Sequence, residues 1–399
     1  MRIIMASRES DWRREAENSI LLKSVSHWRE KPDRWFRGSY DRLPETVRVN
    51  PMSEEKDWVE SWLSGIGANK IPWFSGPGSA WEMPFERGSA EEEVKSLMSA
   101  LHETGRITRQ EAVSMLPVLA LDPTPGQIIL DLCASPGSKT TQICEHLGDS
   151  GAVVANEVIS GRVNTLVTNV QRHASRTVLV VQHDGRHIPR VPGSGFDGVL
   201  VDVPCTGSGT TRKNPDVWGK WRPSSGRSLH SLQYDLLSRA IALTKPGGRV
   251  VYSTCSLDPI ENEAVVARVL AGGKVRVVTR GDSLAGVPSN PGMTNWPLLN
   301  DRGELDIESK SEEYLIPTKD KAISSQLNDC LRVWNDEIGG GGFFLAVLEK
   351  ILEDDVSGVV NPFPSQKTFD DPESFPQPID DQRERELREV WGSVPSNMW

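Results

Sequence analysis

From about residue 125 onward, short apolar runs alternate with stretches of helical spacing. Strands separated by helices imply a mostly parallel sheet with helices on both faces, so the predicted fold class is α/β. The expected strands are 128–133, 152–158, 177–182, 198–203, 249–253, 274–278 and 342–348. The expected helices are 138–147, 162–172, 229–243 and 261–270.

The segments on either side of this pattern have a different character. Residues 1 to about 50 have helical spacing, 50–90 are rich in Trp, Pro and Gly and suggest loops and short elements, and 90–104 predict a helix. The end of the chain combines prolines with acidic residues, which predicts a largely mobile tail with a short helix at 381–390. We therefore expect an N-terminal extension at 1–120, an α/β domain at 121–350 and an acidic tail at 351–399.

Composition limits the classes of protein to consider. The 399 residues are 37% hydrophobic and 25% charged, and no apolar stretch is long enough to span a membrane, so we expect a soluble cytoplasmic protein and a monomer. The five cysteines form no CxxC pair and the histidines have no metal-ligand spacing. A disulfide framework and a metal site are therefore not expected.

The net charge of −10 is unevenly distributed along the chain. Residues 351–399 hold 11 acidic and 4 basic residues, whereas residues 1–49 hold 11 basic and 8 acidic ones. The segment 212–227 has five basic residues and one acidic residue. A local basic surface can bind phosphates even on an acidic protein, so nucleic acid remains a possible partner.

Two of the apolar runs end in a cysteine. The run 196–205 ends in Cys205, and the run 248–255 ends in Cys255. The carboxyl edge of an open α/β sheet is where ligands bind, and a thiolate there can attack an electron-poor carbon. Two such thiols suggest a covalent step and a separate resolving step, although free cysteines are also common in protein cores.

The run from Leu130 to Lys139 predicts a strand, a tight turn and the start of a helix. It matches neither of the glycine-rich motifs for dinucleotides or nucleoside triphosphates. Small residues let a ligand approach the backbone, and the helix start favours a carboxylate. A simple turn between a strand and a helix is the alternative interpretation.

The next two expected strands also end in acidic residues. Glu157 lies about twenty residues after the turn, a spacing that suits a ribose diol, and Asp184 could accept a hydrogen bond from an adenine amino group. Either residue alone is also typical of surface charge or of a cap. Together they predict an adenosine-bearing cofactor with a free carboxylate, which fits S-adenosylmethionine better than a nicotinamide dinucleotide.

These motifs resemble the Nop/Sun-domain RNA cytosine-5 methyltransferases, above all their eukaryotic-type and archaeal tRNA branch. The pair Pro204-Cys205 and Thr254-Cys255 is specific to this class, whereas Ser135 stands where the family more often has Ala. The tRNA branch often continues into a C-terminal RNA-binding domain, where this sequence has the acidic tail. The resembling stretches are 110–117, 131–141, 202–210, 212–218, 252–263 and 341–344.

The resemblance implies a class I, Rossmann-like methyltransferase sheet and an N-terminal α+β RNA-binding extension. It implies that Cys255 adds to C6 of cytosine, that Cys205 helps to eliminate Cys255 afterwards, and that Asp202 binds the cytosine edge. The cofactor residues that it implies are Cys133, Ala134, Ser135, Pro136, Gly137, Ser138, Lys139, Glu157, Arg162, Asp184 and Asp202. The partner it implies is RNA, with tRNA first and ribosomal RNA second.

Several alternatives remain open at this stage. In a DNA cytosine-5 methyltransferase Cys205 would be the nucleophile, and an RNA-binding assembly factor would retain only a vestige of methylation. Arg212 and Lys213 could hold RNA phosphates or belong to a solvated loop. Trp218 and Trp221 could stack on bases or pack beneath that loop.

Overall fold

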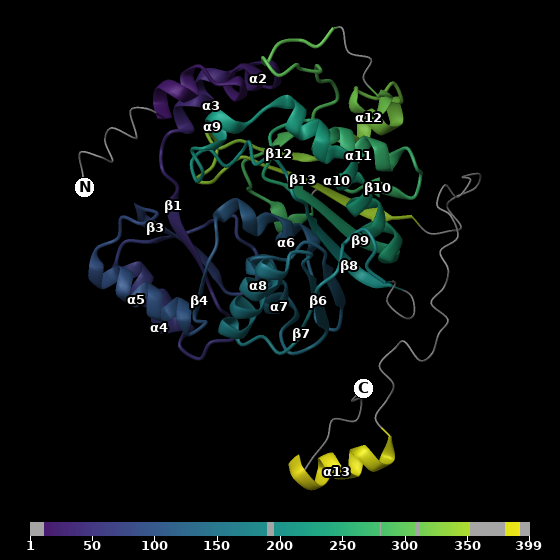
Figure 1. The fold of residues 1–399 in the computed structure, drawn as a ribbon. Coiled ribbons are helices and arrows are strands. Elements are labelled where there is room, and N and C mark those ends of the chain that lie inside the picture. The colour runs from purple at the N-terminus through teal and green to yellow at the C-terminus, as the bar shows by residue number, and fades with distance from the viewer. Residues whose placement is uncertain (1–11, 190–194, 280, 308–311, 352–379, 392–399) are drawn as a thin grey trace. The chain divides into compact units, whose positions relative to one another are not determined.

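The computed structural model describes residues 12–189, 195–279, 281–307, 312–351 and 380–391 (Figure 1). The chain divides into two compact units, Met1–Ser357 and Gly358–Trp399. Within the described residues, no helix is both long and apolar enough to span a membrane.

The N-terminal part of the first unit is built on a four-stranded antiparallel sheet with the order β2-β3-β1-β4. Helices α4 and α5 pack on it around a core that contains Val47, Leu63, Trp81 and Leu101. The elements of this part are α2 (Ile20–Trp28), α3 (Pro32–Gly38), β1 (Pro44–Val49), α4 (Lys56–Gly65), β2 (Asn69–Lys70), β3 (Ser79–Glu86), α5 (Glu92–Glu103) and β4 (Ile107–Arg109).

The larger sheet has the order β11-β12-β13-β9-β8-β5-β6-β7, with β10 paired to β13. Strands β5 to β9 run parallel, and β13, β12, β11 and β10 are antiparallel to their neighbours. Its elements are η1 (Ala112–Met115), α6 (Leu116–Leu121), β5 (Ile128–Asp131), α7 (Ser138–Leu147), β6 (Ala152–Asn156), α8 (Ser160–His173), β7 (Val178–Val181), β8 (Phe196–Asp202), α9 (Val217–Lys220), α10 (Pro223–Leu243), β9 (Thr244–Thr254), α11 (Glu263–Leu270), β10 (Val275–Val277), η2 (Asp282–Leu284), β11 (Asn290–Pro291), η3 (Glu313–Leu315), α12 (Lys321–Leu327), β12 (Leu331–Val333) and β13 (Phe343–Lys350).

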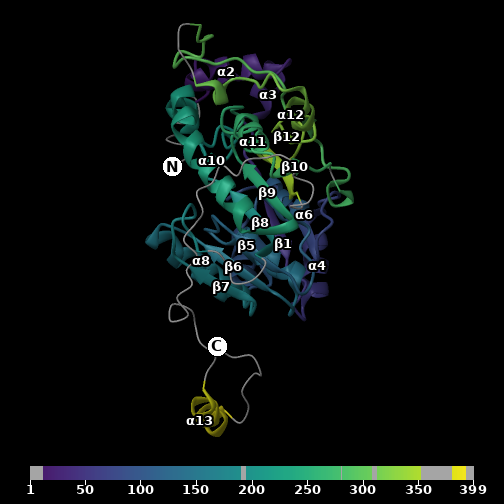
Figure 2. The same ribbon diagram turned by 90° about the vertical axis from the view of Figure 1, so that its right-hand side faces the viewer.

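Successive residues of the central strands enter opposite cores, as the two-residue period of a strand requires. On β8, Val199 and Val201 face the core under α10 and α11, whereas Leu200 faces the core under α6 and α7. Helix α8 lies beside α7 and α10 beside α11, so helices cover both faces (Figures 1 and 2). The predicted α/β class is confirmed, and the antiparallel strands make the sheet mixed.

The N-terminal helices α2 and α3 pack on the short helix α9 through tryptophans. The ring centroids of Trp28 and Trp221 are 5.7 Å apart, and those of Trp35 and Trp218 are 5.5 Å apart. All four side chains are buried. The N-terminal helices thereby cover the loop that follows Cys205.

A buried ion pair joins the N-terminal sheet to the larger one. Arg48 on β1 donates to Glu145 on α7 over 2.5 Å, and His173 lies 2.9 Å from the same carboxylate. Removing one partner of such a pair leaves the other buried and uncompensated, which costs about 3–5 kcal/mol. A Cβ on Gly105 would lie 2.2 Å from the carbonyl oxygen of Arg172, so the two parts also meet at backbone distance.

The structure departs from the sequence predictions mainly before residue 90. The prediction of loops and short elements at 50–90 did not specify the ten-residue helix α4 or the eight-residue strand β3, and the helical prediction for 1 to about 50 fails at β1. Burial on the N-terminal sheet outweighed the Pro, Gly and Trp signals there. The boundary at residue 120 stays a prediction; α6, in which it lies, packs against β8 and β9.

The second unit contains helix α13 (Asp381–Trp391), where a short helix was predicted. Most of the predicted tail, residues 352–379 and 392–399, lies outside the described residues.

Candidate active site

The carboxyl ends of β5, β6, β7, β8 and β9 carry the predicted site residues. Because these strands are parallel, their carboxyl ends meet at one edge of the sheet. The residues brought to this edge are the 133–139 loop after β5, Glu157 after β6, Asp184 after β7, Asp202 and Cys205 at β8, and Cys255 after β9.

The 133–139 loop turns sharply from β5 into α7. Gly137 caps the helix with a φ of 109°, a left-handed conformation that favours glycine. Asn169 on α8 donates to the carbonyl oxygen of Pro136 over 2.7 Å, and the Ala134 amide donates to Asn156 over 2.8 Å. Burial raises the pKa of the Cys133 thiol well above its usual range, so this thiol stays protonated.

Arg162 holds this loop against the next strand end. Its guanidinium donates to the carbonyl oxygen of Ser135 over 2.9 Å and lies 3.3 Å from the carboxylate of Glu157. Glu157 also accepts from the amide of Ile159 over 2.9 Å, and its side chain is almost fully buried. The structure therefore brings together Arg162, Glu157 and the loop.

Asn156 organises three strand ends, although its sequence context suggested no role for it. Its side-chain nitrogen donates to the carbonyl oxygens of Leu132 and His183, each over 3.0 Å, while its side-chain oxygen is buried without a partner. The available signal was its position directly before Glu157. An unpaired buried oxygen at this edge is suited to accept a hydrogen bond from a ligand.

Asp184 lies farther out and is partly exposed. Its carboxylate accepts a hydrogen bond over 2.6 Å from Arg186, and that bond lowers its pKa to about 2. Of the predicted cofactor residues it has the loosest connection to the others.

The two predicted thiols lie side by side, with 3.2 Å between the Sγ atoms of Cys205 and Cys255. They follow neighbouring parallel strands in which Asp202 is paired with Ser253, so the pairing of β8 with β9 brings them together. The hydrogen bond to Cys255, followed by burial, raises the pKa of Cys205 well above its usual range. Cys205 is therefore suited to remain a protonated thiol beside Cys255.

Asp202 connects the thiols to the 133–139 loop. Its Oδ2 accepts from Lys139 Nζ over 2.8 Å, and its Oδ1 accepts from Ser253 Oγ over 2.7 Å. Burial lowers the pKa of Lys139, but the charges of Asp202 and Asp131 outweigh burial and leave that pKa above its usual value. Lys139 is thus a cation that holds Asp202 in place.

A cavity of about 370 Å³ opens over this group. Lys139, Asp202 and Cys255 line it from the larger sheet, and Arg87 and Arg109 line it from the N-terminal sheet. A reacting group in this cavity would meet a thiol, a carboxylate and an ammonium group, with guanidinium groups around it.

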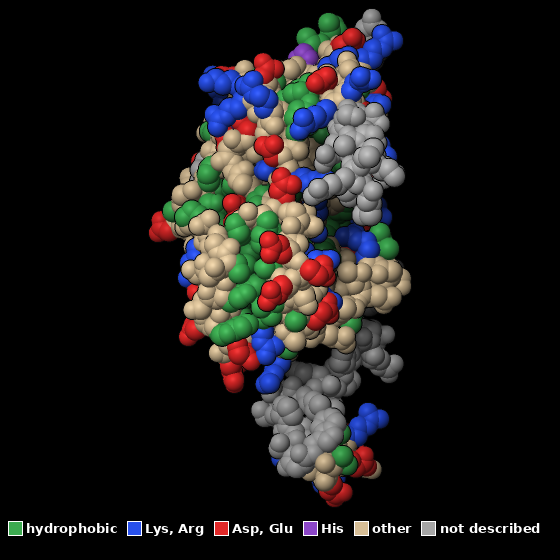
Figure 3. Space-filling view, turned by 90° about the vertical axis from the view of Figure 1, so that its left-hand side faces the viewer, with side chains coloured by type: hydrophobic (Ala, Val, Ile, Leu, Met, Phe, Trp, Pro, Cys, Tyr) green, Lys and Arg blue, Asp and Glu red, His purple; other side chains and the backbone are tan. Residues whose placement is uncertain are grey.

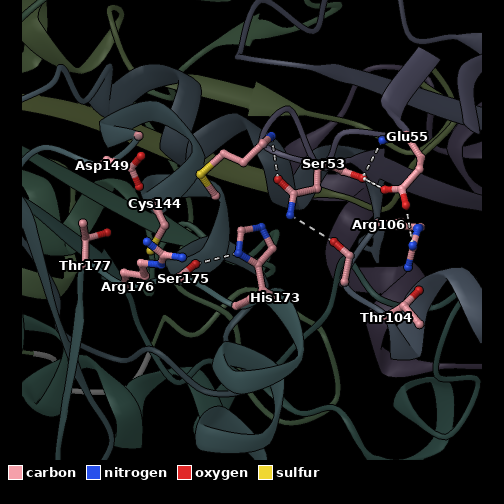
Figure 4. A pocket seen from close by; sticks show the side chains of 15 residues that line it. Ser53, Glu55, Thr104, Arg106, Cys144, Asp149, His173, Ser175, Arg176 and Thr177 are labelled. Carbon is pink, nitrogen blue, oxygen red and sulfur yellow. Dashed lines mark hydrogen bonds and ion pairs between the residues drawn. The ribbon is translucent and has the colours of Figure 1, made fainter. Parts of the chain in front are cut away.

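A second hollow, of about 410 Å³, adjoins the first and shares Gly105 and His173 with its lining (Figure 4). Polar groups in its wall are paired with one another: Arg106 with Glu55 over 2.6 Å, and His173 with Ser175 over 2.6 Å. This hollow follows the junction between the N-terminal part and the larger sheet, and none of the predicted site residues lines it.

The structure also decides several of the open alternatives. Trp218 and Trp221 are buried and pack beneath the loop, so they do not present faces to bases. Arg212 donates to the carbonyl oxygens of Asp41, Arg42 and Gly340, which makes it a structural residue. Lys213 is exposed and lines the 370 Å³ cavity.

Residues 118–349 match the protein family described as 16S rRNA methyltransferase RsmB/F. The chain belongs to this family. It is 37% identical over 308 residues to the multisite-specific tRNA:(cytosine-C(5))-methyltransferase of Saccharomyces cerevisiae, a match covering 71% of this chain and 45% of the relative. It is 43% identical over 228 residues to the ribosomal RNA small subunit methyltransferase F of Escherichia coli, covering 56% and 46%.

The resemblance in sequence extends to the fold. A solved methyltransferase homolog from Pyrococcus horikoshii has a TM-score of 0.61 and 27% identity, covering 82% of this chain and 93% of that one. Against the curated relatives, however, the chain spans less than half of their length. The predicted family is confirmed.

Proposed function

We propose that the protein transfers a methyl group from S-adenosylmethionine to C5 of cytosine in RNA, and that the RNA is tRNA. The observation that carries this proposal is the pair of thiols in contact at 3.2 Å beside a carboxylate, at the carboxyl ends of two parallel strands. Family membership supports the same chemistry.

The residues at the edge of β5, β6 and β7 fit the proposed cofactor. A Cβ on Gly137 would lie only 3.0 Å from Leu166, so the turn depends on glycine at this position. The orphaned oxygen of Asn156 and the carboxylate of Glu157 are suited to accept hydrogen bonds from the cofactor. Val158 and Ile159 are each 53% exposed beside them and offer an apolar surface for an adenine ring. S-adenosylmethionine supplies an electrophilic methyl group.

In the proposed mechanism the thiolate of Cys255 adds to C6 of cytosine, and the ring electrons move towards C5. The displaced electron pair reaches N3, which takes up a proton, and Asp202 accepts a hydrogen bond from the cytosine amino group and stabilises this protonated edge. After methyl transfer C5 gives its proton to a base such as water, and the electron pair of that C–H bond re-forms the C5–C6 double bond as the bond between C6 and Cys255 breaks. Cys205, which stays protonated beside Cys255, assists that elimination.

One observation favours tRNA over ribosomal RNA as the substrate, and two support the binding of RNA in general. The match to the yeast tRNA enzyme covers more of this chain than the match to the bacterial ribosomal RNA enzyme. Lys31, Arg37 and Lys213 are exposed basic residues. Figure 3 shows lysine and arginine side chains gathered on one face at the height of α2, α3 and α9. Phosphate contacts of this kind bind a nucleic acid without reading its sequence. Ribosomal RNA is the second candidate, because the family description and the bacterial relative name it.

The proposal assigns RNA binding to residues 1–120, the chemistry to 121–350 and no catalytic role to the tail at 351–399. One chain supplies the thiols, Asp202 and the cofactor loop, so the chain acts as a monomer in this proposal. The thiols must stay reduced, which suits the cytoplasm.

A denaturing gel of the protein with S-adenosylmethionine and either tRNA or ribosomal RNA tests the proposal. The chains compared are the wild type, Cys205→Ala, Cys255→Ala and the double variant. A covalent adduct with tRNA that accumulates in Cys205→Ala and vanishes in the double variant is the expected result.

An adduct that needs Cys205 but survives the loss of Cys255 would reverse the roles of the two thiols. An adduct with ribosomal RNA only would change the substrate, and RNA binding without any adduct would support the assembly-factor alternative.

A further inference from the structure

Glu261 lies behind the two thiols and is hydrogen-bonded to both of the loops that carry them. From the Cys205 loop, the amide of Thr206 donates to Glu261 Oε2 over 2.8 Å, and the Thr206 hydroxyl donates to Oε1. From the Cys255 loop, the hydroxyl of Ser256 donates to the same Oε1 over 2.5 Å. One carboxylate therefore holds the residue that follows each thiol.

A fourth donor completes this arrangement. Gln233 on α10 donates through Nε2 to Glu261 Oε2 over 3.0 Å, and to the carbonyl oxygen of Pro204 over 2.9 Å. Tyr252 on β9 donates to the backbone oxygen of Glu261 over 2.5 Å. The strand that leads to Cys255 and the helix behind Cys205 are thus connected to the same residue.

Burial makes this use of a carboxylate costly. Glu261 has no exposed surface. Burial raises the pKa of its carboxyl group and its four hydrogen bonds lower it, and the net pKa lies above the usual value. A buried carboxylate is retained where each of its oxygens is needed as an acceptor. Here each oxygen accepts from two donors. The amide nitrogen of a glutamine would face either two N–H donors or two hydroxyl groups that would have to turn from donors into acceptors, so the present set of four hydrogen bonds would be lost.

We propose that Glu261 is the positioning residue that holds the thiols of Cys205 and Cys255 in contact. Their roles as releasing thiol and nucleophile rest on the proposed function, but the contact itself does not. Oε1 is the atom that accepts from both cysteine loops, so weakening its hydrogen bonds to Thr206 and Ser256 lets one loop move relative to the other, and the two sulfur atoms then separate.

Glu263 provides a matched control two residues farther along the chain. It is equally buried, but it pairs with Arg332 through two contacts of 2.5 Å and accepts from the amide of Met293, and it is connected to the Cys255 loop only through Arg332, which donates to the carbonyl oxygen of Leu257. Glu263→Gln removes a buried carboxylate as Glu261→Gln does, and it leaves the connection between the thiols intact.

The first experiment measures the contact without RNA or cofactor. Diamide takes two electrons and two protons from a pair of neighbouring thiols, which form a disulfide while diamide becomes the corresponding hydrazine. We expect the wild type and Glu263→Gln to form the Cys205–Cys255 disulfide at similar rates, as followed by peptide mass mapping. We expect Glu261→Gln to form it more slowly, by about tenfold or more.

Equal rates in Glu261→Gln and the wild type would overturn the proposal, as would a wild type that forms no such disulfide. If Glu261→Gln does not fold, Thr206→Val and Ser256→Ala each remove one arm of the network and take its place. The proposal is supported if both variants form the disulfide slowly while their circular dichroism spectra are those of a folded protein. Disulfide formation at the wild-type rate in both variants would refute it.

The second experiment uses turnover. With tRNA, we expect Thr206→Val to accumulate adduct, because it loosens the loop of the releasing thiol, and Ser256→Ala to form adduct slowly. Failure of the proposed function would leave Cys205→Ala without adduct while the diamide result stood. Failure of the positioning role would leave adduct formation and release unchanged in both variants.

Discussion

Asp184 and Asp258 follow two strands of the same sheet, β7 and β9, in opposite surroundings. Asp184 is one-third exposed, and its hydrogen bond to Arg186 lowers its pKa to about 2. Asp258 is buried, and burial together with the charge of Glu261 raises its pKa to about 8. The ends of β5, β6 and β7 form a cofactor half that is buried at Asn156 and Glu157 and opens to solvent at Asp184, whereas the ends of β8 and β9 form a thiol half whose polar groups bond to one another.

This difference follows from what each half has to do. A half that binds a diffusing ligand keeps acceptors available, such as the unpaired oxygen of Asn156. A half that must keep two sulfur atoms 3.2 Å apart uses its hydrogen bonds internally, because orientation is set before the reaction begins. The contact between Lys139 and Asp202 joins the two halves.

The largest expected effect comes from breaking that contact. Lys139→Met removes the cation that holds Asp202, so we expect kcat for RNA methylation to fall by about 10²–10³. Cofactor affinity should change much less, because Lys139 contributes only part of the loop. Single-turnover methylation and calorimetric titration with S-adenosylhomocysteine measure the two quantities. Lys220→Met, at an exposed position, is the control, and an unchanged kcat in Lys139→Met would contradict the role assigned to Lys139.

The next effect concerns stability and compares Asp258 with Asp184 by pH. Between about pH 4 and pH 8 folded Asp258 holds a proton that the unfolded chain has lost, so the free energy of unfolding falls as the pH rises through this window. At about 1.4 kcal/mol per pKa unit this contribution amounts to a few kcal/mol, and Asp258→Asn should lack it. Urea unfolding at several pH values compares the chains.

Asp184→Asn is the matched control for this measurement. Its carboxylate is ionised in both the folded and the unfolded chain over most of that window, so its substitution should leave the pH dependence close to that of the wild type. If the free energy of unfolding depends on pH in the same way in Asp258→Asn and in the wild type, the raised pKa of Asp258 is contradicted, and the thiol half does not exclude water as described.

A smaller effect is expected within the cofactor half. Glu157→Gln replaces a charged acceptor for the ribose by a neutral one, and should weaken S-adenosylhomocysteine binding by about 10- to 100-fold. Oxidation of the thiol pair by diamide should keep its wild-type rate, since Glu157 has no contact with the thiol half. A change in that rate would show that the two halves are more tightly coupled than their contacts suggest.

The smallest effect is expected at Asp184. Because this carboxylate is partly exposed and already bonded to Arg186, Asp184→Asn should weaken cofactor binding by less than about tenfold. The same calorimetric titration measures it. A loss of cofactor affinity larger than that of Glu157→Gln would mean that Asp184 contributes more to cofactor binding than Glu157 does.

Much of the larger sheet could be predicted because its signals are local. The helix at 138–147 was predicted with the bounds of α7, and the strand at 198–203 overlaps β8. The strands β1 and β3 were missed because they gain their stability from burial on partners far away in the chain. Trp218 and Trp221 stand between basic residues in the sequence, but their partners Trp35 and Trp28 come from the N-terminal helices.

The sequence by itself determined the alternation of strands and helices from about residue 125 to 270, the family, and which residues come to the carboxyl edge, because a strand end and the turn after it are encoded together. Only the tertiary structure decided that Cys205 and Cys255 touch and that Lys139 reaches Asp202. It also decided that Arg212 supports a loop and that Glu261 holds both thiol-bearing loops. These contacts join segments separated by about 50 residues or more, and depend on how parallel strands are placed side by side, which no local pattern records.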